Sequence, residues 1–145
     1  MTNLLVSWQF WAFLAAIFAA LAAVFVKLGV QTINSDLATF LRTLVVAVAL
    51  GGLVWATGKF ETLSGVDGRT WVFLVLSGLA TGASWLCYFR AMQLGDASRV
   101  APVDKLSVVF VAVFAALFLG EKLSVTGWAG VSMIAAGAVL VAISA

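Results

Sequence analysis

Five long apolar stretches, separated by short polar or glycine-containing breaks, dominate the pattern of this chain. They cover residues 8–30, 36–57, 69–94, 98–119 and 124–144, and the longest polar connector lies at 58–68. Each stretch is close to the roughly 20 residues that an α-helix needs to cross about 30 Å of hydrocarbon. The pattern therefore predicts an all-α membrane protein whose five transmembrane helices form a single domain over residues 1–145.

The fourth stretch carries two adjacent charges, Asp104 and Lys105, well inside its apolar run. If Ser98 begins the helix, Asp104 lies about 9 Å along its axis, too deep for a short side chain to return to water. A charge at that depth is costly, so we expect Asp104 either to form an ion pair, with Arg42 or Arg90, or to have a buried functional role.

Pro102 stands two residues before Asp104. A proline in the first turns of a helix can be structurally innocuous. Alternatively, it loosens the start of the span and frees a carbonyl, as in the broken helices of transporters, and Pro102 is then a hinge.

The other charges within the apolar stretches gather toward one side of the membrane. Successive spans cross in opposite directions, so Lys27, Arg42 and Arg90 fall on the same side as Asp104 and Lys105, opposite the N-terminus. The long side chains of Lys27 and Arg90 could instead snorkel to the headgroups, and so could that of Arg42, which lies deeper. Because four different helices place charged side chains at a similar depth, a common polar cavity is favoured.

Most tryptophans mark the opposite interface, where indole rings anchor helices among headgroups. The five in this belt are Trp8, Trp11, Trp55, Trp71 and Trp128. Trp85 is the exception, because it lies close to Tyr88 in the half of the third stretch that holds the charges. It is interpreted either as lining the cavity or as packing.

Composition sets limits on the chemistry. The chain is 64% hydrophobic and 10% charged, its mean hydropathy is +1.17, and its net charge of +2 is spread along the sequence. The sequence contains no basic patch, so it does not indicate a nucleic acid partner. Because the chain has no His and one cysteine, Cys87, we expect no enzyme, metal or cofactor chemistry. The first stretch has no Lys or Arg before it and is expected to be retained rather than cleaved.

Several motifs resemble the EamA domain of the drug/metabolite transporter superfamily. The strongest are the span containing Pro102, LGEKLS at 119–124, GWAG at 127–130 and GAVL at 137–140. A second match joins FVKLG at 25–29 to FLR at 40–42. Independently of the resemblance, Gly120 predicts the end of a helix at the membrane surface.

The resemblance implies a multi-pass carrier of small metabolites in the bacterial inner membrane, often an exporter of amino acids or related compounds. Such carriers commonly contain two inverted EamA domains, whereas this chain has five spans and one such repeat. The missing half is expected from a second copy. Near the loops, three basic residues fall on each side, so the positive-inside rule permits both orientations. An antiparallel homodimer is favoured over a parallel dimer or a hetero-pair.

For the mechanism we expect alternating access, with the first four spans lining the path. The excess of basic groups favours a substrate with a carboxylate or phosphate. The residues expected to bind substrate or to couple transport are Lys27, Arg42, Trp85, Tyr88, Arg90, Asp104 and Lys105. Two alternatives stay open: an exporter of organic cations like the small multidrug carriers, whose first-span glutamate is missing here, and a non-transporting subunit of a flippase or other complex.

Overall fold

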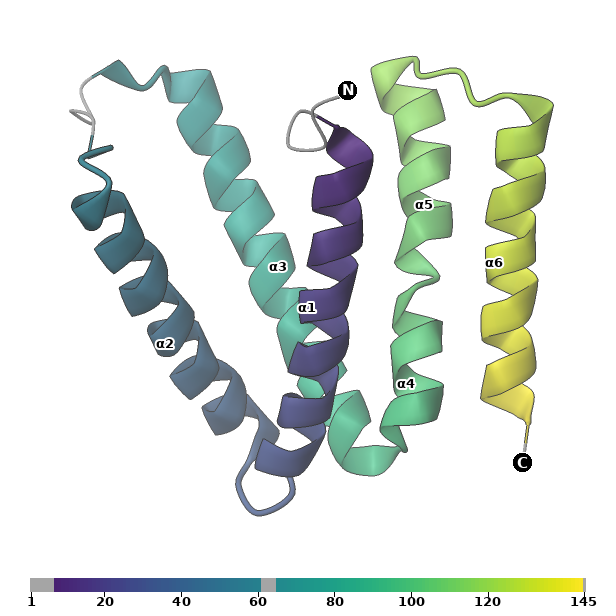
Figure 1. The fold of residues 1–145 in the computed structure, drawn as a ribbon, viewed down its shortest axis with the longest axis horizontal. Coiled ribbons are helices and arrows are strands. Elements are labelled where there is room, and N and C mark those ends of the chain that lie inside the picture. The colour runs from purple at the N-terminus through teal and green to yellow at the C-terminus, as the bar shows by residue number, and fades with distance from the viewer. Residues whose placement is uncertain (1–6, 61–64, 145) are drawn as a thin grey trace. The chain divides into compact units, whose positions relative to one another are not determined.

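The computed structural model describes residues 7–60 and 65–144, and these contain helices and no strand. Residues 61–64 of the expected polar connector lie outside the described part. The helices are α1 (Trp8–Gly29), α2 (Ser35–Ala56), α3 (Gly68–Leu94), α4 (Ala97–Asp104), α5 (Ser107–Phe114), the π-helix η3 (Ala115–Leu119) and α6 (Val125–Ile143) (Figure 1). With α4, α5 and η3 taken together as Ala97–Leu119, five helical segments are long and apolar enough to cross a membrane. The expected all-α membrane fold is confirmed, and each observed bound lies within one residue of the range expected from the sequence.

Polar side chains and one glycine define several helix ends. The Asn34 side chain accepts hydrogen bonds from the backbone N–H groups of Asp36 and Leu37, at 2.8 and 3.3 Å, and so caps the start of α2. Gly120 ends η3 with a φ of 68°, in the left-handed region where glycine pays no steric penalty. The N–H of Glu121 then donates to the carbonyl of Ala115 at 3.1 Å, which satisfies a carbonyl of the last turn. The predicted helix end at Gly120 is therefore present.

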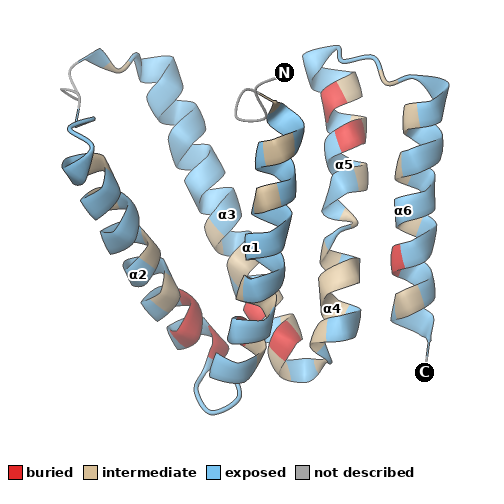
Figure 2. Cartoon of the chain, viewed as in Figure 1, coloured by how far each residue is buried: buried red, intermediate tan, exposed pale blue. Residues whose placement is uncertain are grey.

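Contacts divide the chain into two compact units. The terminal unit is Met1–Phe25 with Leu94–Ala145, and the central unit is Val26–Gln93. In the terminal unit α6 packs along α4 and α5. The small buried side chains of this unit are Ala112, Ala115 and Ala138. The buried residues of the central unit gather near the α1–α2 turn, at the start of α2 and the end of α3 (Figure 2); they are Val26, Val30, Ser35, Ala38, Thr39, Phe89 and Met92. That all five helical segments form one domain stays a prediction.

Most of the large apolar side chains are exposed in the single chain. Phe118 on η3 and Val125 at the start of α6 are 78% and 87% exposed, for example. In water such a surface would be unfavourable, but in a bilayer lipid tails or neighbouring helices cover it.

The fourth span is interrupted. The sequence predicts one helix over 98–119, but α4 ends at Asp104 and α5 begins only at Ser107. Pro102 stands inside α4 rather than in its first turn, and because it has no N–H it cannot bond the carbonyl of Ser98. After it, Lys105 and Leu106 donate to Pro102 and Val103 at 3.1 and 3.0 Å, a tighter spacing of three residues. Pro102 thus stands beyond the first turn, where a proline removes a helical hydrogen bond, and its role as a hinge stays a prediction.

Candidate functional site

An arginine and two aromatic rings meet between α2 and α3 in the central unit. The Cζ atom of Arg42 lies 4.4 Å from the ring centroid of Trp85 and 5.7 Å from that of Phe89. Phe89 is buried, and Arg42 and Trp85 are each half-buried. A guanidinium against an aromatic face is attracted by about 0.5–2 kcal/mol, more strongly as water is excluded. The structure therefore brings together two of the residues that the sequence indicates for the site.

Arg42 also lies well inside α2 rather than at the start of the helix. It stands seven residues after Ser35, the first residue of α2, which places it about 10 Å along the helix axis. Within residues 7–60 and 65–144, no hydrogen bond or ion pair joins its guanidinium to an acceptor. The aromatic rings stabilise the cation but do not neutralise it, so the surroundings favour an anion at this position.

Lys27 and Gln93 join the ends of α1 and α3. Lys27 Nζ donates to the carbonyl of Met92 at 2.9 Å, and Met92 is fully buried. Gln93 Nε2 donates in return to the carbonyls of Val30 and Ile33, at 3.0 and 2.7 Å. Lys27 thus donates to a carbonyl in the last turn of α3, which the helix leaves without an intrahelical partner, and Gln93 donates to carbonyls of the α1–α2 turn. We call these contacts the reciprocal cap.

The sequence did not indicate this role for either residue. Lys27 was expected to snorkel or to line a cavity, and neither interpretation includes a bond to a backbone carbonyl. Gln93 was not singled out at all, although an amide at the end of a long apolar run is a signal for a helix cap. Binding of substrate by Lys27 stays a prediction.

Replacing Gln93 tests the reciprocal cap. Gln93→Leu keeps the side-chain size but removes the donors to Val30 and Ile33, so we expect unfolding to become easier by about 1–3 kcal/mol. Thermal unfolding in detergent, followed by circular dichroism, measures the change. Gln9→Leu is the matched control, because Gln9 is exposed near the start of α1. Equal stability of the two variants would contradict a structural role for Gln93.

The remaining candidates on α3 flank the buried ring of Phe89. Tyr88 is half-buried, and Arg90 is exposed and donates through Nη1 to Gln93 Oε1 at a long 3.4 Å. Arg90 therefore adds an outer contact to the reciprocal cap. A direct contact of either residue with substrate stays a prediction.

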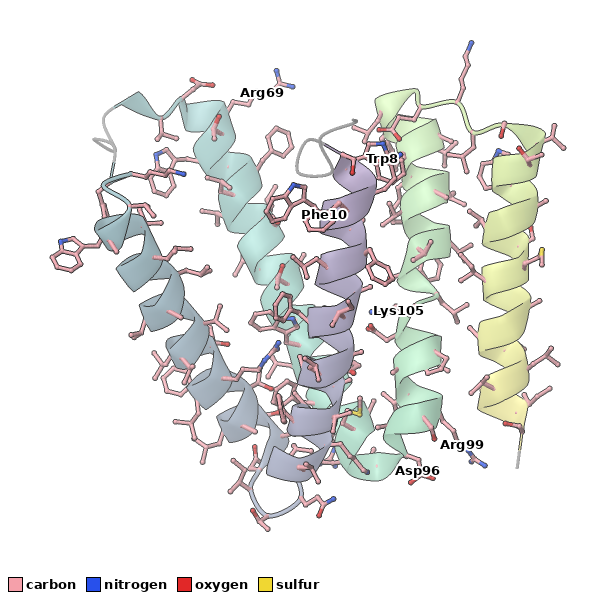
Figure 3. All side chains as sticks on the ribbon, viewed as in Figure 1. Trp8, Phe10, Arg69, Asp96, Arg99 and Lys105 are labelled. Atoms are coloured by element: carbon pink, nitrogen blue, oxygen red, sulfur yellow. The ribbon has the colours of Figure 1, made fainter. Side chains whose placement is uncertain are left out.

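Asp104 and Lys105 lie at the interruption between α4 and α5, in the terminal unit (Figure 3 labels Lys105). Asp104 Oδ2 and Lys105 Nζ form a salt bridge of 3.2 Å, and their side chains are 35% and 56% exposed. Both side chains are thus partly open in the single chain, and in a bilayer charges at this depth are costly unless they are paired or face a polar cavity. The expected ion pairs of Asp104 with Arg42 or Arg90 stay predictions.

Membrane-crossing helices with charged groups inside their spans, one of them broken at a proline, define a multi-pass membrane protein built around intramembrane polar groups. The model of the EamA-like transporter family matches residues 6–143. The chain belongs to this family, as its motifs indicate. A protein of Sinorhizobium sp. described as an "uncharacterized transporter in cobO 3'region" is 63% identical over 137 residues, which are 94% of this chain and 97% of that protein. No solved structure matches.

Proposed function

We propose that the protein is a secondary transporter, not an enzyme, that exports small metabolites such as amino acids or organic anions across the bacterial inner membrane. The interruption between α4 and α5 carries the proposal. In many transporters, broken helices place free backbone groups and charged side chains beside the substrate near the membrane centre. Here the break follows Pro102 and has Asp104 and Lys105 at its edge.

Alternating access needs a part that bends and a group that senses the driving ion. Pro102 supplies a point where α4 lacks a backbone hydrogen bond, so bending there breaks less structure than in a regular helix. Asp104 is the acidic side chain that lies deep in a span, so it is the candidate for carrying the coupled proton. Lys105 beside it provides a charge that can pair with Asp104 when the proton leaves.

The working unit is proposed to be an antiparallel homodimer. One chain contributes five spans, and inverted repeats surround a transport path from both halves. The outer side of α6 offers apolar residues to a second copy, for example Val125, Met133 and Ile143, which are 87%, 75% and 71% exposed. Similar numbers of basic residues near the two ends of the spans permit both orientations.

Flux through vesicles that contain only the purified protein tests the transport function. A panel of amino acids, organic anions and organic cations is loaded, and release is followed with and without a pH gradient. Saturable release of one class above that of empty vesicles supports the proposal. Preference for cations would favour the multidrug alternative, and no flux of any class would favour a non-transporting subunit.

Crosslinking tests the orientation. In a Cys87→Ser background, Val125→Cys and Ile143→Cys place thiols at opposite ends of the exposed side of α6. Two differently tagged copies, one carrying each substitution, should crosslink to each other in an antiparallel dimer. Crosslinks only between identical positions would establish a parallel dimer instead.

A further inference from the structure

We infer that Arg42, held on Trp85, binds the carboxylate of a monoanion whose remaining body is apolar and uncharged. The inference rests on the proposed transport function, because it assigns a substrate class to that path. It depends on the contacts within the central unit alone.

The first step is the geometry of the guanidinium. The Cζ atom of Arg42 lies over the Trp85 ring, 4.4 Å from its centroid. The N–H donors of a guanidinium lie around its edge, and a contact with an aromatic ring does not use them as hydrogen bonds to an oxygen acceptor would. Since no acceptor among the described residues satisfies them, a planar carboxylate can take two parallel N–H···O bonds from one edge.

The second step is the charge of the ligand. Lys27 donates to the Met92 carbonyl, and Arg90 is exposed and directed to Gln93, so Arg42 is left as the cation placed on the aromatic rings. One positive charge balances one negative charge. A phosphate monoester carries about −1.5 to −2 at neutral pH and would remain undercompensated here.

The third step excludes a cationic group on the ligand. The described acids of the central unit are Asp36, in the first turn of α2, and Asp67, just before α3. Asp36 lies about 9 Å along the helix axis from Arg42, and its side chain accepts from the Ser35 hydroxyl at 3.2 Å. An ammonium on the ligand would meet Arg42 and aromatic rings without a carboxylate beside it. The rings of Trp85 and Phe89 instead suit an apolar body.

A lipid phosphodiester is also a monoanion and could supply the same chemistry from the bilayer. The two sources differ in one respect: a lipid headgroup competes only when anionic phospholipid is present, whereas a soluble carboxylate binds in its absence. The composition of the membrane therefore separates them.

The experiment is isothermal titration of the purified protein in nanodiscs made of phosphatidylcholine alone. The probes share one aromatic ring and differ in charge: benzoate, phenyl phosphate and benzylamine. We expect benzoate to bind at least about tenfold more tightly than the other two, the effect of a charged hydrogen-bonded pair. Arg42→Lys should weaken benzoate binding about tenfold, because it keeps the charge but loses the bidentate edge, and Arg42→Gln should abolish it.

Arg69→Lys is the matched control. The Cζ atom of Arg69 lies 5.8 Å from the centroid of the Phe73 ring. Arg69 is therefore also an arginine beside an aromatic ring, but it is the second residue of α3 and lies at the start of the helix (Figure 3). Its replacement should leave benzoate affinity unchanged. Circular dichroism of each variant confirms folding, and Arg42→Lys serves if Arg42→Gln does not fold.

Three results would overturn the inference: equal binding of all probes, tighter binding of phenyl phosphate or benzylamine, or an unchanged affinity in Arg42→Lys. A fourth concerns the lipid. If adding phosphatidylglycerol removes benzoate binding in the wild type, and Arg42→Lys no longer retains that lipid on purification, the occupant is a lipid phosphate. Because the titration needs no transport, benzoate binding without flux would reject the proposed function alone, and flux without benzoate binding would reject this inference alone.

Discussion

We expect Asp104→Asn to abolish export driven by a proton gradient, while exchange of substrate between the two sides of the membrane continues. The amide has nearly the same size as the carboxyl group but cannot take up or release a proton. Coupled export needs that change in charge in each cycle, whereas exchange returns the transporter loaded with substrate. We expect the proton-driven rate to fall at least about a hundredfold, equivalent to about 2.7 kcal/mol of barrier.

Vesicles with an imposed pH gradient measure the driven rate, and counterflow of labelled substrate at equal pH measures exchange. Asp96→Asn is the matched control, because Asp96 is an exposed acid directly before α4 and outside the span (Figure 3). Retention of proton-driven export by Asp104→Asn would remove Asp104 from coupling. Its carboxylate would then have only the salt bridge to Lys105 as a role.

We expect Pro102→Ala to slow transport by about tenfold or more while making the protein more stable. Alanine restores an N–H opposite the carbonyl of Ser98 and favours a regular helix through the region where α4 now ends. A proline inside a helix costs up to about 3 kcal/mol relative to alanine. A stiffer span should therefore melt at a higher temperature and bend less readily, so the barrier to the change between inward- and outward-open states rises.

The measurements are the turnover rate in vesicles and the melting temperature of the same preparation. Val103→Ala, at the neighbouring and partly exposed position, is the control, because it shortens a side chain without adding a backbone donor. If Pro102→Ala raised stability and left the rate unchanged, the interruption would be a fixed feature of the span rather than a hinge.

The sequence was sufficient to predict the five helical segments because their length and apolar character are imposed by the bilayer. The interruption of the fourth segment was harder to predict from the sequence. A proline shortly after Ser98 is compatible with a helix start, and whether it breaks the helix depends on where the first turn begins, which the structure places at Ala97.

The structure brings two of the expected site residues together, and their binding of substrate stays a prediction. Arg42 and Trp85 were both indicated by their depth on neighbouring spans, but rotation about each helix axis decides whether they meet, and the sequence does not fix that rotation. The bond from Lys27 to Met92 was missed because it ends on a backbone carbonyl, which every residue possesses. Residues next to each other on a regular helix point about 100° apart, so Asp104 and Lys105 need not share a partner. In the structure the two side chains contact each other at 3.2 Å, where α4 ends.

The reciprocal cap has a mechanical consequence. Three hydrogen bonds join the last turn of α1 and the α1–α2 turn to the end of α3: Lys27 with Met92, and Gln93 with Val30 and Ile33. Separating α2 from α3 at this end would break these bonds, so separation costs less farther along the two helices. A movement that takes Arg42 away from Trp85 and keeps the three bonds would leave the joined end in place.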